Sequence, residues 1–224
     1  MASPAQLNSK TVQPMENCSR YCDGYDYREM KRCPLDGPDC PFHRPRLLQP
    51  IGFGERYWDA TIEQISGQNA RESIQTYIDA IDEAITAGRG LYVQGGVGSG
   101  KTCILTLVGY AAAAADASLK IEYWYAGELF DHLHRGDQDA IDKAYYCDLL
   151  LLDDFGVQYA IDWTVTRFDA LVEYRYAHRK AMCVTTNVGR EELRADDRWR
   201  RVYDRWKEMC EGISAGKESM RGSQ

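Results

Sequence analysis

A glycine-rich run that ends in lysine and threonine is the segment best equipped for chemistry. It reads GGVGSGKT and fits the spacing GxxxxGK(S/T) at every position. Glycines let backbone N–H groups curl around phosphate oxygens, Lys101 can neutralise the β- and γ-phosphates, and the Thr102 hydroxyl can bind Mg²⁺. The run therefore predicts a site for ATP and Mg²⁺. Its expected nucleotide-binding residues are Gly95, Gly96, Val97, Gly98, Ser99, Gly100, Lys101, Thr102 and Cys103.

A pair of aspartates follows a strongly apolar run in YYCDLLLLDDFG. Four leucines predict a buried strand, whose carboxyl end would bring Asp153 and Asp154 to the crevice that holds the phosphate loop. We expect Asp153 to hold Mg²⁺ through water, and Asp154 to orient or deprotonate the attacking water. Taken alone, the same acids could merely cap the next helix.

A polar triplet ends a second apolar run, AMCVTTNV, with Thr185, Thr186 and Asn187. The amide of Asn187 could position the lytic water between the other two motifs. Without those motifs, TTN at a strand end is more typical of a turn. The proposed role of Asn187 therefore depends on its neighbours in the fold.

Cysteines cluster near the amino terminus in the pattern C-x3-C-x10-C-x6-C, formed by Cys18, Cys22, Cys33 and Cys40. Four thiolates around a tetrahedral Zn²⁺ would stabilise a segment with too few aliphatic residues to fold alone. His43, three residues further on, is a candidate substitute ligand or simply a polar surface residue. The other cysteines are expected to be small core residues: Cys103, Cys147, Cys183 and Cys210.

The elements that position these groups follow an alternating order. Apolar residues at helical spacing over 74–85 predict one amphipathic helix before Gly88. Strands are expected over 90–94, 121–124, 149–152 and 182–186, and helices over 103–115, 127–134 and 163–178. This alternation predicts parallel strands with helices on both faces of the sheet. The phosphate loop falls between a strand and a helix, which disfavours a mere glycine-rich turn.

The bulk composition fits one α/β nucleotide-binding domain with a small appendage. The chain has 224 residues and a formal net charge of −7, which argues against a protein covered in basic residues that binds duplex DNA unaided. No run reaches the roughly twenty apolar residues of a membrane span, and no signal peptide is evident, so we expect a cytoplasmic protein. The expected divisions are a flexible leader over 1–17, a zinc-binding module over 18–48 and the nucleotide-binding domain over 49–224.

In order along the chain, these segments resemble the DnaC/DnaI/IstB group of AAA+ ATPases, above all bacterial and phage helicase loaders. The similarity runs from about Tyr57 to Arg221 and includes ERYWDATIEQI, GGVGSGKT, LLLLDDFG, EYRYAHRKAMCVTTNV, RVYDRWKEMC and ESMR. It implies an α/β fold with a five-stranded parallel sheet flanked by helices and a minimal or absent C-terminal lid. It also implies that Asn187 is the sensor-1 residue, Arg205 the arginine finger toward a neighbouring subunit, and Arg221 the sensor-2 arginine.

Two features depart from the wider AAA+ pattern. Asp154 stands where many members have glutamate, and its shorter side chain predicts slower hydrolysis, although paired aspartates also look familiar within the loader group. The sequence has three residues after Arg221, so we expect a minimal or absent helical lid, as in the loader group. Without the resemblance, the arginines between 198 and 205 would form an ordinary solvated helix face.

The leading hypothesis is an oligomeric ATP switch that self-associates through its ATP sites, binds a replicative DNA helicase and places it on single-stranded DNA. By the same resemblance, the zinc module would contact either a partner protein or single-stranded DNA. Its tyrosines suit both kinds of contact. The alternatives are an IstB-like transposition regulator acting on duplex DNA, a small-molecule kinase, and a binding adaptor without ATPase activity.

Overall fold

The computed structural model describes residues 25–26, 31–32, 43–156 and 162–216. The chain divides into two units, residues 1–46 and 47–224. In the first unit, β1 (Tyr25–Asp26) pairs antiparallel with β2 (Lys31–Arg32). The predicted leader and the predicted zinc ligands lie outside the described residues: Cys18, Cys22, Cys33 and Cys40.

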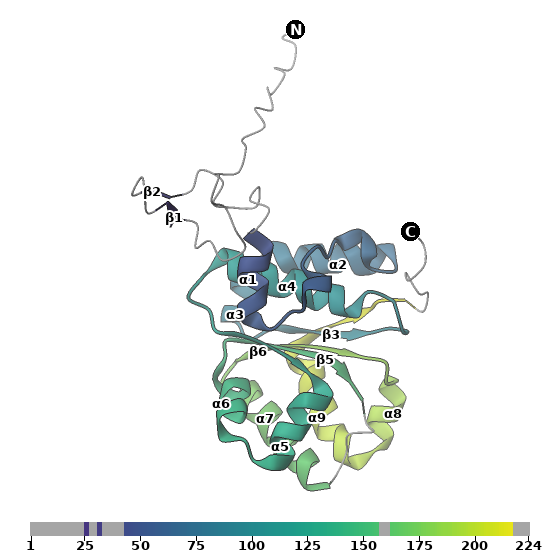
Figure 1. Ribbon diagram of the computed structural model, residues 1–224. Coiled ribbons are helices and arrows are strands. Elements are labelled where there is room, and N and C mark those ends of the chain that lie inside the picture. Colours follow the sequence, from purple (N-terminus) through teal and green to yellow (C-terminus); the bar gives the residue numbers. More distant parts are fainter. Residues whose placement is uncertain (1–24, 27–30, 33–42, 157–161, 217–224) are drawn as a thin grey trace. The chain divides into compact units, whose positions relative to one another are not determined.

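A five-stranded, all-parallel sheet forms the centre of the second unit, in the order β4-β5-β6-β3-β7 (Figure 1). The predicted parallel sheet is therefore confirmed. The inner strands are almost wholly buried, as expected for apolar runs covered on both faces. Their bounds are β3 (Gly90–Gln94), β4 (Ile121–Tyr125), β5 (Leu149–Phe155), β6 (Ala181–Thr186) and β7 (Cys210–Ser214).

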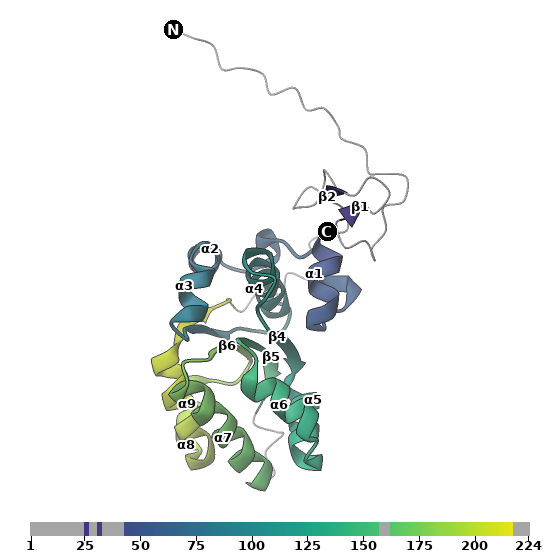
Figure 2. The ribbon, with the colours of Figure 1, turned by 90° about the vertical axis from the view of Figure 1, so that its left-hand side faces the viewer.

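Helices cover both faces of this sheet (Figures 1 and 2). One core lies against α2 (Gln68–Asp79), α3 (Ile81–Thr86) and α4 (Lys101–Ala115), and it also includes Leu48 and Ile51 of α1 (His43–Ile51). The other core lies against α5 (Ala126–Arg135), α6 (Gln138–Tyr146), α7 (Asp162–Ala177), α8 (Arg190–Ala195) and α9 (Asp197–Met209). Two short 3₁₀ helices, Glu55–Tyr57 and Ile62–Gln64, precede α2. In the described part of the chain, no helix is both long and apolar enough to cross a membrane.

Three local expectations need correction. The single helix expected over 74–85 is two helices, because the chain bends at Ala80, whose φ of −112° and ψ of 26° are not helical. The helix α6 and the fifth strand, β7, were not located by the sequence pattern, and β7 has only one well-buried residue, Ile213. Cys147 and Cys183 are core residues as expected, whereas Cys103 and Cys210 are only partly buried, since they lie at the start of a helix and of an edge strand.

A buried arginine ties the α6–β5 junction to the start of β6. Arg175 lies on α7 and is 0% exposed. Its Nη1 donates to the carbonyl oxygens of Ala144 (2.8 Å) and Cys147 (3.2 Å), and its Nη2 donates to that of Ala181 (2.5 Å). Burial lowers the pKa of Arg175. The guanidinium thus supplies donors to carbonyl groups at the amino ends of the strands.

Candidate functional site

The phosphate loop joins the end of β3 to the start of α4 and has a backbone that requires glycine. Gly98 and Gly100 have φ angles of 81° and 92°, in the left-handed region. A Cβ on Gly100 would lie 2.4 Å from the carbonyl oxygen of Gln64. The glycines of the motif therefore serve both the loop conformation and its close contact with the segment before α2.

Two flanking segments fix the loop from outside. The N–H of Gly96 donates to the carbonyl of Gly216 (3.0 Å), just beyond β7. The N–H of Ser66 donates to the carbonyl of Ser99 (3.1 Å), and the Ser99 hydroxyl donates to Gly96 (2.9 Å). The loop is therefore held by residues that come both early and late in the chain.

Lys101 folds back over the loop and reaches Asn187, just beyond β6, the strand that pairs with β3 in the sheet. Its Nζ donates to the carbonyls of Gly95 (3.0 Å) and Gly96 (2.8 Å) and to Oδ1 of Asn187 (2.6 Å). The side chain is nearly buried, at 9% exposed. The ammonium thus stands between the loop and the end of β6.

Asp153 is the hub of the site, 5% exposed at the carboxyl end of β5. Its Oδ2 accepts from Thr102 (2.7 Å) and from the Tyr123 hydroxyl (3.1 Å), and its Oδ1 accepts from Thr185 (2.5 Å). Burial, and then the charge of Asp153, raises the pKa of Tyr123, so this phenol stays protonated and donates. Carboxylate and hydroxyl oxygens side by side are the ligands that Mg²⁺ prefers.

Asp154 has a left-handed backbone, with a φ of 54°, which is rare for a residue other than glycine. Its N–H donates to the Thr185 hydroxyl (2.9 Å). Its carboxylate accepts from Nδ2 of Asn187 (3.2 Å) and, more weakly, from the Tyr125 hydroxyl (3.4 Å). This carboxylate is only half-buried, so a water molecule can reach it.

The structure brings five of the predicted site residues together: Lys101, Thr102, Asp153, Asp154 and Asn187. They come from the carboxyl ends of β5 and β6 and from the first turn of α4, where parallel sheets bind ligands. A lysine, a hydroxyl–carboxylate pair and a second, accessible carboxylate can together bind a magnesium triphosphate and direct water at it. Val97, at the tip of the loop, is 69% exposed.

The predicted arginine finger lies apart from this network. Arg205 on α9 donates from Nη1 to Asp169 of α7 (2.8 Å) and is also paired with Glu173. Its side chain is 21% exposed, whereas those of Arg200 and Arg201 are 59% and 77% exposed. Arg205 is thus more buried than Arg200 and Arg201 and does not belong to an ordinary solvated face of α9. Arg221 lies outside the described residues.

Sequence reasoning assigned no role to three residues that contact the acids, namely Tyr123, Tyr125 and Thr185. A signal for the tyrosines was present in IEYWY, because residues two apart on a strand share a face. Reading it required knowledge that β4 pairs with β5, with Tyr125 opposite Asp153.

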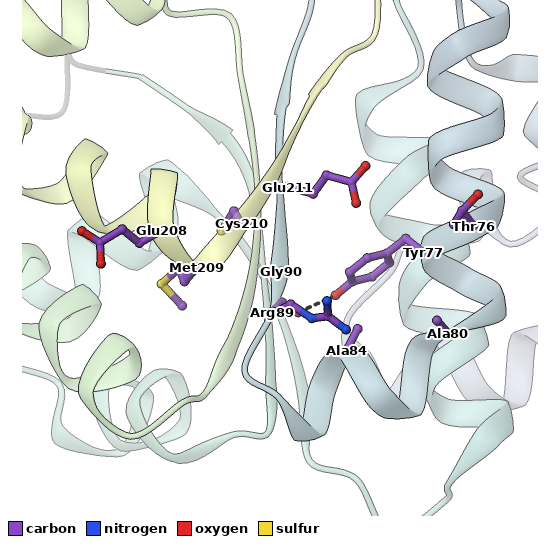
Figure 3. Close-up of a pocket in the computed structure, with 10 residues that line it drawn as sticks. All are labelled: Thr76, Tyr77, Ala80, Ala84, Arg89, Gly90, Glu208, Met209, Cys210 and Glu211. Atoms are coloured by element: carbon purple, nitrogen blue, oxygen red, sulfur yellow. Dashed lines mark hydrogen bonds between the residues drawn. The ribbon is translucent and has the colours of Figure 1, made fainter.

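A separate pocket of about 320 Å³ lies between α2, α3 and the start of β7 (Figure 3). Its lining includes Tyr77, whose hydroxyl donates to the carbonyl of Arg89 (2.9 Å). Gly90 of its lining begins β3, whereas the phosphate loop follows the other end of that strand. None of the predicted site residues lines this pocket, so we do not assign the predicted chemistry to it.

Comparison with known proteins gave relatives in sequence and in structure, although no family model matches the chain. The chromosomal replication initiator protein DnaA of Bordetella avium is 28% identical over 168 residues, which are 73% of this chain and 33% of the relative. DnaA of Bordetella petrii is 32% identical over 112 residues, 48% of this chain and 23% of the relative. The chain thus matches about a third or less of the length of these curated relatives.

Solved structures share the fold. The DnaC helicase loader matches with a TM-score of 0.60 and 22% identity over 72% of this chain and 99% of its own. DnaI matches with a TM-score of 0.60 and 19% identity over 76% of this chain and 95% of its own. DnaA bound to AMPPCP and single-stranded DNA matches with a TM-score of 0.55 and 22% identity over 73% of this chain and 50% of its own. At these sequence identities, all below 25%, the structural matches show a shared fold and nothing further.

Proposed function

We propose that this chain, an AAA+ ATPase related to DnaC, DnaI and DnaA, binds a replicative DNA helicase and places it on single-stranded DNA, with ATP hydrolysis as the switch for assembly and release. The observation that carries the ATP switch is the network that joins Lys101, Asn187 and Asp154 beside the Thr102–Asp153 pair. The helicase as partner is proposed from the similarity to DnaC and DnaI. A structural ion-pair cluster would have no need of a glycine loop aimed at the same point.

The site residues suit the steps of phosphoryl transfer to water. Lys101 would neutralise the β- and γ-phosphates, and Thr102 with Asp153 would hold Mg²⁺, whose charge offsets that of the triphosphate. Asp154 would orient or deprotonate the attacking water, and Asn187, which donates to Asp154, would fix its direction. Hydrolysis is expected to be slow in the isolated chain, because Asp154 is short and already accepts two hydrogen bonds.

Assembly would complete the site through arginine. In the proposal Arg205 reaches a neighbouring subunit's γ-phosphate, where a guanidinium stabilises the charge on the transferred group. To do so it must exchange Asp169 and Glu173 for phosphate, so the pairs within one chain compete with assembly. Arg221 would act as the sensor-2 arginine by the family resemblance.

The amino-terminal cysteines would stabilise the part of the chain that binds the helicase. Cys18, Cys22, Cys33 and Cys40 have a spacing that suits a tetrahedral zinc site, and a module held by zinc would grip the helicase. Single-stranded DNA is then left to the ATPase domain.

A loading assay with a replicative helicase tests the proposal. The chain should retain the helicase in a pull-down with ATP more strongly than with ADP, and it should place the helicase on single-stranded DNA. Lys101→Ala should abolish ATP-dependent loading, whereas Lys143→Ala, which removes an exposed lysine of α6, should not. Full loading by Lys101→Ala would refute the switch. Assembly on duplex DNA with no affinity for helicase would instead favour a transposition regulator.

A further inference from the structure

We infer that Thr185 is a positioning residue for ATP hydrolysis, whose single hydroxyl holds the Asp153 carboxylate and the Asp154 backbone in the arrangement that Mg²⁺ binding and water activation require. The inference rests on the proposed ATPase function. It goes beyond that function because neither the phosphate-loop pattern nor the family motifs above assign a role to this side chain.

A break in the strand register brings both acids against this one threonine. Leu152 of β5 lies opposite Val184 of β6, and Phe155 lies opposite Thr186. Two residues of β5, Asp153 and Asp154, therefore face the single residue Thr185 on β6, which is the count that defines a β-bulge.

The bulge has a direct chemical consequence. In a regular strand, successive side chains point to opposite faces of the sheet, so two adjacent aspartates could not both serve one site. With the bulge, and with Asp154 at a φ of 54°, one carboxylate contacts Thr102 while the next contacts Asn187. The irregularity is thus what lets a consecutive pair of acids act together.

Thr185 supplies the hydrogen bonds that this irregular backbone needs. A hydroxyl carries one proton and two lone pairs, so it can donate once and accept at the same time. Thr185 donates to Oδ1 of Asp153 (2.5 Å) and accepts from the N–H of Asp154 (2.9 Å). The residue is 0% exposed, so water cannot readily replace either bond.

The donated bond also sets which carboxylate oxygen faces the metal site. Oδ1 of Asp153 is occupied by Thr185, so Oδ2 is the oxygen turned to Thr102 at 2.7 Å. Loss of the hydroxyl would remove this bond to Oδ1 and leave the carboxylate held through Oδ2 alone, by Thr102 and Tyr123, so that it could tilt about that oxygen. Mg²⁺-dependent binding and turnover should therefore suffer, while contacts made by the phosphate loop alone should not.

Three variants test this role. Thr185→Val removes the hydroxyl with little change in shape, and Thr185→Ser keeps the hydroxyl. Thr186→Val is the matched control, because Thr186 is also 0% exposed and its hydroxyl also makes two bonds, to the carbonyl of Phe155 (2.7 Å) and from the N–H of Val188 (2.9 Å). The readouts are ATP affinity in Mg²⁺ and in EDTA, the kcat and KM of hydrolysis, and thermal unfolding.

Thr185→Val should bind ATP in EDTA with an affinity within about threefold of that of the unmodified protein. The gain in affinity that Mg²⁺ provides should fall about tenfold or more, and so should kcat, because a hydrogen bond to a buried charge is lost. Thr185→Ser should recover both to within about threefold. Thr186→Val should lose thermal stability to a similar degree but keep the Mg²⁺-dependent gain in affinity.

A normal Mg²⁺ gain in Thr185→Val would overturn the inference, and so would an equal loss in Thr185→Ser or in Thr186→Val. These outcomes are separable from failure of the proposed function. If the unmodified chain showed no Mg²⁺-dependent ATP binding, the proposed function itself would fall, whereas failure of the inference leaves that binding intact and changes only the ranking of the variants.

Discussion

Replacement of the buried Arg175 by methionine is expected to lower the free energy of unfolding by about 3–5 kcal/mol. Methionine fills part of the same volume but donates no hydrogen bond. It would leave the carbonyls of Ala144, Cys147 and Ala181 short of a donor in the core, at about 1–3 kcal/mol each. Relief from burying a guanidinium, whose pKa is already lowered by burial, offsets part of that loss.

Urea unfolding of the intact chain measures the effect, because the midpoint shift at constant slope reports the change in stability. Arg200→Met is the matched control. Its side chain is 59% exposed in a pair with Asp197, so the same substitution should change stability by no more than about 0.5 kcal/mol. Arg175→Lys, which keeps the charge but not the planar fork, should lie between them.

Arg175→Met should leave the Mg²⁺-dependent ATP affinity of the folded protein unchanged, since Arg175 binds at the amino ends of the strands, away from Asp153. If Arg175→Met cost less than about 1 kcal/mol, burial of the guanidinium would cancel its hydrogen bonds and the reasoning would be wrong.

Three further predictions concern other parts of the chain. Arg205→Ala should keep the ATP affinity of the isolated chain but lose the rise in hydrolysis rate with chain concentration. Asp169→Asn weakens the ion pair that holds Arg205, so the same rise should occur at lower chain concentration. Burial would raise the pKa of Asp148, but the backbone N–H of Lys120 and the Lys180 ammonium outweigh it and lower the pKa. Asp148 therefore stabilises the fold at pH values above its ordinary pKa, and this stabilisation is lost as the pH falls through the lowered pKa. In Asp148→Asn the urea midpoint should depend less on pH in the acid range, and the change should be less than about 1 kcal/mol for this partly exposed group. Cys33→Ser should reduce bound zinc, measured by atomic absorption, from about one ion per chain toward none, and unchanged zinc would exclude it as a ligand.

The sequence reveals the parts of the site that are encoded locally. The glycines, Lys101 and Thr102 are contiguous, and an apolar run on each side predicts the strand and helix that hold them. The two acids follow a run of leucines whose burial is unambiguous. For such segments, the order of residues and the order of chemical groups in space are nearly the same.

The parts that depend on strand pairing could not be read in this way. The bulge at Asp153 and Asp154 exists only against β6, and the contacts of Tyr123 and Tyr125 exist only because β4 lies beside β5. The ion pairs of Arg205 likewise require α9 to pack on α7. The break at Ala80 is hidden because alanine is an excellent helix former, so propensity alone argues against it.

The connections of the phosphate loop suggest how nucleotide and assembly can be linked. The N–H of Gly96 is bound by the carbonyl of Gly216, which follows β7, and β7 continues directly from α9, the helix that carries Arg205. The phosphate loop is thus joined to α9 through one backbone hydrogen bond and the continuous chain of β7. Arg205 is held 2.8 Å from Asp169, so a shift of α9 against α7 that lengthened this distance would weaken the ion pair. The same contacts that stabilise the single chain can in this way set how readily its arginine is given to a neighbour.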